Sequence, residues 1–512
     1  MVAGLLGAGV WAAGAPTVQA NHETLTGARG ERFAQVASFK GIPFAAAPVG
    51  ELRWQAPRPH APRGGTQNAT EFAAACYQDG YNTDWYRELA QNFGVDATAF
   101  ADPPVSEDCL YLNVWTPALG ARARLPVMVW IHGGANKSGW SFEPNYLGEA
   151  LAARGDVVVV TIAYRLGIFG FFGHPQLQGS AAPSNFGLLD QIAALRWVKD
   201  NIRDFGGDAD NVTVFGESAG GADIGYLAAS PLARGLMRRA LVESGGYLME
   251  DASQIADAEK TGMALSNALP GHPNLAALRR LPSAQIFRAA EKAMPEHDYG
   301  PVVDGVSLLM PPAAFYRRHG FPYGLLIGSN ANEWYMYVNE DPASLQKSLA
   351  KMPPAAARLL AERAAREPDV RRGHDQATAL VDMACPAYLM AASARRSGHR
   401  SWVYRFSRVR PGPGALRVLA YHGAEIPYVF DTHDRWLPGD ALDASLTRAM
   451  MAYWSNFARS GDPNGAGLAA WPAFAGASAQ VLDLGARIEP IAAPDRALCE
   501  RVAGELYPGW SQ

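Results

Sequence analysis

The sequence predicts an α/β fold in which a central, mostly parallel β-sheet is flanked by helices. The first observation is that short apolar or β-branched runs, typical of buried strands, recur along the chain. The second is that helical patterns lie between these runs, as expected when parallel strands are joined by crossover helices. The expected strands are residues 126–131, 157–163, 212–215, 239–242, 325–327 and 402–406.

Residues 186–202 carry the clearest helical pattern, because Leu188, Ile192, Leu195 and Val198 recur every three or four residues. Two later segments, 246–320 and 340–398, contain Pro, Ala and charged residues in helical patterns with few strand signals. We therefore expect both segments to be helical insertions that cover one end of the sheet and the active site there.

Composition limits the function classes. The 512 residues are 48% apolar and 18% charged, with a formal net charge of −4, which is typical of a globular chain with a large core. No cluster of Lys and Arg indicates a phosphate-binding surface, so nucleic acid is not an expected partner. Beyond the N-terminus, no stretch reaches the about 18 continuous apolar residues of a membrane helix, and we expect no membrane span.

The N-terminal 20 residues are almost uncharged and rich in Ala, Gly, Val and Leu, and they end in Val18-Gln19-Ala20. This pattern predicts a signal peptide over residues 1–20, cleaved after Ala20, and a secreted or periplasmic protein. No Lys or Arg opens the segment, so a plain apolar N-terminus is the alternative. Residues 21–512 are then expected to form a single domain.

The four cysteines are Cys76, Cys109, Cys385 and Cys499. In an exported protein this even number indicates two disulfides, for which three pairings exist. The alternative is four reduced, buried thiols. Because no C-x-x-C pair is present, neither a metal site nor a redox role is indicated.

The motif Gly216-Glu217-Ser218-Ala219-Gly220 follows an expected strand and precedes a helix rich in small residues. A strand, a sharp turn and a helix are the setting of a nucleophile elbow, so Ser218 is the candidate nucleophile. The helix N-terminus also places its dipole beside a developing negative charge. The alternative is a Gly-rich turn that merely exposes a serine.

A second Gly-rich turn, His132-Gly133-Gly134-Ala135-Asn136, follows the strand at 126–131. Such a turn can direct several N–H groups at one point, as an oxyanion hole requires. The predicted donors are the N–H groups of Gly134, Ala135 and Ala219, the last being the residue after the nucleophile. The alternative is a purely structural turn.

Several motifs together resemble the type-B carboxylesterase and cholinesterase family, whose members have the α/β-hydrolase fold, and the resemblance covers nearly all of the chain after residue 20. The similar blocks are FKGIPF (39–44), PVGELR (48–53), SEDCLYLNV (106–114), NFGLLDQ (185–191), FGGD (205–208), the elbow at 216–220, NFARSGDPN (456–464) and WP (471–472).

The resemblance implies the other two members of a catalytic triad. In the family the acid is a Glu in a G-x-N-x-x-E setting, which here gives Glu333, and the base is a His followed by Gly, which gives His422. From the residues alone the base stays open among the four histidines after Glu333: His374, His399, His422 and His433. His374 and His399 lie in charged, helical surroundings, which leaves His433 as the runner-up.

The implied activity is hydrolysis of a carboxylic ester of a small molecule through an acyl-enzyme intermediate. In this scheme His422 takes the proton of Ser218 and returns it to the leaving alcohol, while Glu333 orients the imidazole. No metal or cofactor is required. The resemblance also implies the disulfides Cys76–Cys109 and Cys385–Cys499, and two buried ion pairs, Arg53–Glu107 and Arg165–Asp190.

The chain departs from the family at the oxyanion turn, where Ala135 replaces a third glycine and Asn136-Lys137 follows in place of the frequent aromatic residue. If position 135 needs a positive φ, Ala is strained there by about 1 kcal/mol or more. We hypothesise that Lys137 binds an acidic group of the substrate, with a solvent-facing lysine as the alternative. The other candidate substrate-binding residues are Asn136, Glu217 and the aromatic residues Trp85, Tyr86, Trp140, Tyr247 and Trp334. Each of these aromatic residues is equally typical of packing.

Other functions fit parts of the pattern. A non-catalytic binding module of the same fold is the main alternative from another class, although such proteins usually lose the Ser or the His. Amide hydrolysis and lipase action are nearby enzymatic alternatives. The sequence identifies neither the natural ester nor the oligomeric state.

Overall fold

The central sheet is built from strands that are apolar along almost their whole length. The computed structural model describes residues 14–246, 252–433, 436–476, 479–507 and 510. Its strands are β1 Thr17–Ala20, β2 Glu23–Thr26, β3 Ala28–Arg29, β4 Ala37–Pro43, β5 Thr66–Asn68, β6 Ala75–Cys76, β7 Val105–Ser106, β8 Tyr111–Thr116, β9 Leu125–Ile131, β10 Val158–Ile162, β11 Gly207–Glu217, β12 Arg239–Glu243, β13 Gly324–Asn330, β14 Ser401–Phe406, β15 Gln480–Leu484 and β16 Ile488–Ala492.

Eleven of these strands form one sheet in the order β16-β15-β14-β13-β12-β11-β9-β10-β8-β4-β3. The strands from β10 to β15 in that order pair in parallel, whereas β8, β4, β3 and β16 pair with their neighbours in antiparallel fashion. All seven residues of β9 and all five of β10 are buried, as expected for parallel strands with both faces covered. The predicted mostly parallel sheet is confirmed, and each of the six expected strands overlaps one of β9 to β14.

Helices cover both faces of the sheet and extend beyond it. They are α1 Tyr81–Asn92, α2 Glu149–Gly155, α3 Gly167–Gly170, α4 Phe186–Asn201, α5 Ala219–Ala229, α6 Ile255–Asn267, α7 Leu275–Arg279, α8 Ser283–Ala293, α9 Pro312–His319, α10 Pro342–Leu349, α11 Pro354–Ala364, α12 Val370–Ala379, α13 Cys385–Arg396, α14 Ala415–Val418, α15 Ile426–Phe430, α16 Ala441–Ser460 and α17 Arg496–Leu506. The predicted helix at 186–202 is α4.

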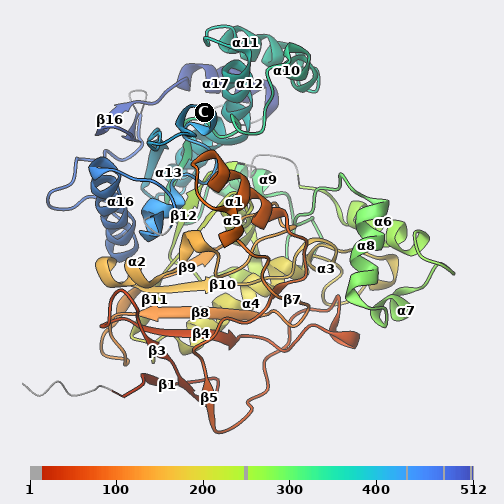
Figure 1. The fold of residues 1–512 in the computed structure, drawn as a ribbon. Helices are drawn as coiled ribbons and strands as arrows, with labels where there is room; N and C mark the ends of the chain where they lie inside the picture. The colour runs from red at the N-terminus through yellow and green to blue at the C-terminus, as the bar shows by residue number, and fades with distance from the viewer. Residues whose placement is uncertain (1–13, 247–251, 434–435, 477–478, 508–509, 511–512) are drawn as a thin grey trace, which may run out of the picture.

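The two expected insertions form separate groups. Helices α6, α7 and α8 lie together on one side of the molecule, while α10, α11 and α12 gather with α17 elsewhere (Figure 1). The end of the second segment behaves differently, because α13 packs directly against β13 and β14. That part of 340–398 is therefore a crossover helix of the sheet itself.

The helical segment Val370–Arg396 is long and apolar enough to cross a membrane, although charged residues interrupt its apolar sequence. Its most apolar window is 67% buried inside the protein. Cys385 within it also forms a disulfide with Cys499 on α17. These contacts are those of a core helix.

Both disulfides implied by the resemblance are present, Cys76–Cys109 and Cys385–Cys499. The first closes a loop that contains α1. Both expected ion pairs are present as well: Arg53 contacts Glu107 at 2.5 Å and Arg165 contacts Asp190 at 2.7 Å. These buried contacts hold the N-terminal loops and the start of α4 against the sheet.

The predicted signal peptide lies only partly within the described residues, because residues 1–13 fall outside them. Residues Thr17–Ala20 form β1, which pairs in antiparallel fashion with β2, and Val18 and Ala20 are buried. Cleavage after Ala20 would remove this strand. The signal peptide stays a prediction.

Candidate active site

Ser218 lies in a sharp turn between β11, which ends at Glu217, and α5, which begins at Ala219. Its backbone angles are φ 55° and ψ −128°, a conformation that non-glycine residues rarely adopt and that often marks a functional position. The flanking glycines allow the strand and the helix to approach closely. A Cβ atom would lie 2.6 Å from the carbonyl oxygen of Ile131 at Gly216, and 2.1 Å from it at Gly220.

The second Gly-rich turn lies beside this elbow, since a Cβ atom on Gly133 would approach the Cβ of Ser218 to 3.0 Å. Gly134, Ala135 and Asn136 have consecutive positive φ values of 102°, 55° and 56°. Ala135 therefore has the conformation in which an alanine is strained by about 1–2 kcal/mol.

Three N–H groups at this site are available to an oxyanion. Within the described residues, the N–H groups of Gly134, Ala135 and Ala219 donate to no other protein group. Gly134 and Ala135 belong to the turn, and Ala219 is the first residue of α5. A carbonyl oxygen between the turn and the helix N-terminus could accept from both elements.

Glu333 and His422 meet although they are far apart in the sequence. The Nδ1 atom of His422 lies 2.6 Å from Oε2 of Glu333. Glu333 is fully buried, and its Oε1 accepts hydrogen bonds of 2.6 Å from the Ser244 hydroxyl and from the Asn330 N–H. The carboxylate is thus held at three points and can orient the imidazole ring.

The other ring nitrogen of His422 faces a carboxylate. Nε2 lies 3.3 Å from Oε1 of Glu217, and no hydrogen bond joins His422 to Ser218 among the described contacts. Burial acts to lower the pKa of His422, but the adjacent carboxylates of Glu217 and Glu333 outweigh it and raise the pKa. Ser218, Glu217 and His422 line the same cavity.

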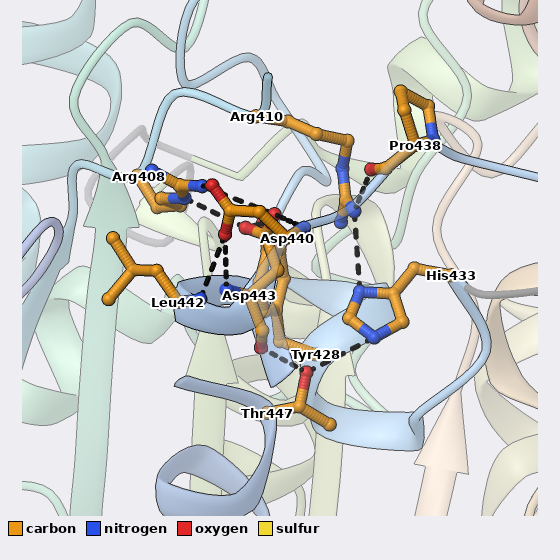
Figure 2. Close-up of polar contacts among 9 residues, drawn as sticks. All are labelled: Arg408, Arg410, Tyr428, His433, Pro438, Asp440, Leu442, Asp443 and Thr447. Carbon is orange, nitrogen blue, oxygen red and sulfur yellow. Dashed lines mark hydrogen bonds and ion pairs between the residues drawn. The ribbon is translucent and has the colours of Figure 1, made fainter. Parts of the chain in front are cut away.

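The runner-up base, His433, belongs to a different network (Figure 2). Its Nδ1 lies 3.3 Å from Nη1 of Arg410, and its Nε2 lies 3.3 Å from the Thr447 hydroxyl. His374 is buried on α12, where Nε2 lies 3.2 Å from the hydroxyl of Ser348. Of the four histidines after Glu333, His422 lines a cavity with Ser218.

Two cavities reach Ser218 and Ala135. The first has a volume of about 330 Å³, and the second of about 420 Å³. The first is lined by Tyr81, Asn82, Trp85, Tyr86, Trp130, Gly133, Gly134, Ala135, Glu143, Asn145, Tyr146, Glu217, Ser218, Trp334, Tyr337, His422, Gly423 and Ile426. The second is lined by Ala135, Asn136, Phe171, Ser218, Ala219, Ala222, Tyr226, Ala252, Ser253, Asp257, Ala258, His297, Asp298, Tyr299, Gly300, Pro301 and Val302.

The predicted substrate-binding residues divide between these cavities. Trp85, Tyr86, Glu217 and Trp334 line the first, and Trp334 also stacks on His422 with 5.2 Å between ring centroids. Asn136 lines the second.

Two of the other predicted residues, Lys137 and Trp140, line neither cavity. Lys137 lies with its Nζ 5.9 Å from the ring centroid of Tyr299, which lines the second cavity. Trp140 is buried, and its backbone N–H donates a hydrogen bond to Glu143. Tyr247 lies outside the described residues. The acid-binding role of Lys137 stays a prediction.

Sequence reasoning missed Glu143 and Tyr337, which both line the first cavity. Glu143 accepts hydrogen bonds from the Tyr86 hydroxyl at 2.9 Å and the Trp140 N–H at 3.0 Å, joining α1 to the segment after the oxyanion turn. Tyr337 accepts a 2.8 Å bond from Nε1 of Trp85 and is 46% exposed, so this bridge lies at the solvent side of the cavity. The sequence offered one signal for each residue: Glu143 follows the oxyanion turn closely in the chain, and Tyr337 follows Glu333 closely.

The chain is similar to known proteins over most of its length. Residues 14–498 match the model of the carboxylesterase family. A fumonisin B1 esterase of Sphingopyxis macrogoltabida is 33% identical over 483 residues, covering 86% of this chain and 82% of that protein. Carboxylesterase 1C of Mus musculus is 35% identical over 476 residues, covering 86% of this chain and 83% of that protein.

Solved structures lead to the same family. A thermophilic PNB esterase superposes with a TM-score of 0.79 at 30% identity, covering 95% of this chain and 99% of that chain. A carboxylesterase of Geobacillus stearothermophilus gives a TM-score of 0.79 at 32% identity over 94% of this chain and 99% of that one. The fold is therefore that of the α/β-hydrolase esterases, and this chain belongs to the carboxylesterase family.

Proposed function

We propose that this chain hydrolyses carboxylic esters through an acyl-enzyme formed on Ser218, with His422 as general base and acid and Glu333 as its orienting partner. One observation carries the proposal. His422, bonded to Glu333 at 2.6 Å, lines the same cavity as Ser218. Gly134 and Ala135 line this cavity too, and within the described residues their N–H groups donate no hydrogen bond.

In the first half-reaction the Ser218 hydroxyl oxygen attacks the ester carbonyl carbon and its proton passes to Nε2 of His422. The carbonyl oxygen becomes an anion that accepts hydrogen bonds from Gly134, Ala135 and Ala219. Collapse of this intermediate breaks the bond to the alcohol oxygen, which takes the proton from His422. Glu333 stabilises the transient imidazolium.

In the second half-reaction water replaces the alcohol. His422 removes a proton from the water, whose oxygen attacks the acyl carbon, and the same N–H groups stabilise the second oxyanion. Cleavage of the bond to Ser218 releases the carboxylic acid, and the serine oxygen regains its proton from His422.

One movement is required before the first proton transfer. Nε2 of His422 faces Glu217, the neighbour of Ser218, at 3.3 Å, so the imidazole and the serine hydroxyl have to turn toward each other. Catalytic hydrogen bonds in enzymes are often long or poorly aligned until the substrate binds. The two side chains line the same cavity, which supports a local adjustment rather than a rearrangement of the fold.

The two cavities suggest separate sites for the acyl and the alcohol part of the ester, but they do not select one substrate. Two relatives are named fumonisin B1 esterase and cocaine esterase, so the family alone does not indicate which ester this chain hydrolyses. A panel that varies the acyl and alcohol parts independently would define the preference. Comparing charged with neutral esters on Lys137→Met belongs in the same panel, and equal losses on both would argue against an acid-binding lysine.

Replacement of the nucleophile tests the proposal. Ser218→Ala is expected to lose nearly all activity on 4-nitrophenyl butyrate, by about 10⁶-fold as in other triad enzymes. It should also lose labelling by a fluorophosphonate probe. Ser180→Ala, at an exposed serine, is the matched control and should retain both. Activity that survives in Ser218→Ala would end the proposal.

The same experiment separates the alternatives. A non-catalytic binding module would not be labelled at Ser218. A lipase would show activation when its substrate forms an oil–water interface, and an amidase would cleave matched anilides as readily as esters.

We also propose that the protein is exported, with residues 1–20 removed as a signal peptide. The apolar segment that ends in Val18-Gln19-Ala20 and the two disulfides support this. N-terminal sequencing of protein from the culture medium or periplasm is the test. A mature N-terminus at Asn21 agrees with the proposal, whereas an N-terminus that retains β1 contradicts cleavage at this position.

A further inference from the structure

A buried carboxylate joins the two elements that carry the candidate oxyanion donors. Asp223 is on α5, shortly after Ser218, and is fully buried. Its Oδ1 accepts a 3.3 Å hydrogen bond from Nδ2 of Asn136, and its Oδ2 accepts a 2.5 Å bond from Nε2 of Gln191 on α4. Asp223 therefore connects the helix after the nucleophile with the residue after Ala135.

Asn136 is held at two points. Its side chain binds Asp223, while its backbone oxygen accepts a 2.7 Å hydrogen bond from the N–H of Gly167. Asn136 is only 5% exposed and has a φ of 56°, a left-handed conformation that Asn tolerates better than most residues. These contacts hold the residue that follows Gly134 and Ala135, whose N–H groups donate to no acceptor in the part of the chain that the structure describes.

The three side chains depend on one another. Within the described residues, Oδ1 of Asn136 and Oε1 of Gln191 are buried and accept no hydrogen bond. The side-chain hydrogen bond of each amide is therefore the one that its NH₂ group donates to Asp223. Burial raises the pKa of Asp223 to about 7, while the hydrogen bonds from Gln191 and Asn136 act in the opposite direction. Removal of the carboxylate would leave two buried amide groups unpaired, which is unfavourable.

We propose that Asp223 is a positioning residue for the oxyanion hole: through Asn136, it holds the N–H groups of Gly134 and Ala135 at a fixed distance from the N–H of Ala219. The inference rests on the proposed function and adds a specific support for its transition state. Donors that are already oriented stabilise an oxyanion more than donors that must reorganise. Asp223 itself touches neither the substrate nor the reacting atoms.

Variants at both ends of the contact test this. Asp223→Ala and Asn136→Ala are each expected to lower kcat/KM for 4-nitrophenyl butyrate by about 10- to 100-fold, less than the about 10²–10³-fold lost with a whole donor. The loss should lie in kcat, with little change in KM. Asp223→Asn should retain most activity, because its amide oxygen still accepts from Asn136 and its Nδ2 can donate to Oε1 of Gln191.

A trifluoromethyl ketone supplies the readout that a purely structural role would not change. Attack by Ser218 converts its carbonyl into an oxyanion, and the serine proton passes to His422, so its Ki reports on the oxyanion hole. The Ki should rise in both alanine variants by the factor lost in kcat/KM. The double variant should lose no more than the worse single variant, since both changes break one contact.

A matched control separates positioning from stability. Asp443→Ala removes another buried carboxylate, on α16 in the network of Figure 2, and should lower the unfolding temperature without changing the Ki. If Asp223→Ala does not fold, Asn136→Ala alone carries the test. Unchanged Ki values, or losses that multiply in the double variant, would overturn the inference, whereas an active Ser218→Ala would instead overturn the proposed function.

Discussion

At the scale of single residues, the contact between His422 and Glu217 is the feature with the clearest kinetic consequence. A catalytic base has to lose its proton before it can accept one from serine. The Glu217 carboxylate, 3.3 Å from Nε2, favours the charged imidazolium and so opposes that loss. Glu217 should therefore raise the pH at which the enzyme becomes active, in addition to the effect of Glu333.

Glu217→Gln removes this charge and keeps the shape of the side chain. Because the carboxylate raises the pKa of His422, its removal should lower that pKa, and the acidic limb of the kcat/KM profile should move to lower pH. An opposite charge at this distance commonly shifts a pKa by about 1–3 units, so a shift of about one unit is expected. Glu88→Gln, on α1 and outside both cavities, is the control, and a limb that stays in place in Glu217→Gln would contradict the assignment.

At the scale of elements, a network around Asp443 joins α15, α16 and the segment after β14 (Figure 2). Arg408 contacts Asp443 at 2.7 Å, and the hydroxyl of Tyr428 donates a 2.7 Å bond to the same carboxylate. Asp440 caps α16 by accepting from the N–H groups of Leu442 and Asp443. The network anchors the start of α16, the helix that packs on β9 and β11 behind the elbow.

This network predicts a pH-dependent contribution to stability. Burial alone would raise the pKa of Asp443, but the hydrogen bonds from Arg408 and Tyr428 outweigh it and lower the pKa to about 2. Because the folded-state pKa is below the unfolded value of 3.8, the stabilisation is present above that pH and is lost as the pH falls toward 2. The free energy of unfolding of Asp443→Asn should be about 2 kcal/mol below wild type near neutral pH.

Denaturant unfolding at several pH values measures this difference, which should shrink steadily between about pH 4 and 2. Asp84→Asn, which removes an exposed partner of Arg87, should change stability by no more than about 0.5 kcal/mol at any pH. A difference for Asp443→Asn that is independent of pH would show that packing, rather than ionisation, is responsible.

At the scale of the whole molecule, the two disulfides stabilise different parts of the protein. Cys76–Cys109 closes the loop that carries α1, and Trp85 and Tyr86 on that helix line the first cavity. Cys385–Cys499 joins α13 to α17, and neither helix lines the cavities at Ser218. One disulfide therefore shapes the site, while the other supports the fold behind it.

Removing each disulfide should reveal this division. The double change Cys76→Ala and Cys109→Ala is expected to cost about 3–4 kcal/mol of stability from loop entropy and to raise KM for bulky esters, because α1 is released. The matched pair Cys385→Ala and Cys499→Ala should cost about 4–5 kcal/mol because its loop is longer, and should leave KM unchanged. Thermal unfolding and steady-state kinetics on the four-cysteine protein and both variants check this, and equal KM effects would refute it.

Much of the fold was predictable because the central strands are buried on both faces. Strands such as β9 and β10 are continuous apolar runs, which are easy to recognise. The edge strand β16 mixes exposed and partly buried positions and gives no such run, so it was missed. The end of the 340–398 segment was misjudged for a related reason, since a helical pattern does not say whether the helix packs on the sheet.

The candidate site was predictable where its chemistry is local. The elbow at Ser218 and the turn at Gly134 are short motifs, and each becomes recognisable because it directly follows an expected strand. Glu333 and His422 came from the resemblance, because the surrounding residues alone leave the base open, with His433 as the runner-up. The role proposed for Asp223, like the cavity contacts of Glu143 and Tyr337, depends on contacts between distant segments, which no local pattern encodes.

The presence of two cavities at Ser218 has a consequence for the fate of the acyl group. In the proposed mechanism, the acyl chain stays attached to the serine oxygen when the alcohol departs, and the cavity proposed to hold the alcohol becomes vacant. Any added alcohol that fits this space can then compete with water for the acyl carbon. In alcohol-rich solution the enzyme should therefore carry out transesterification, and the preferred acceptors would reveal the shape of the vacated cavity.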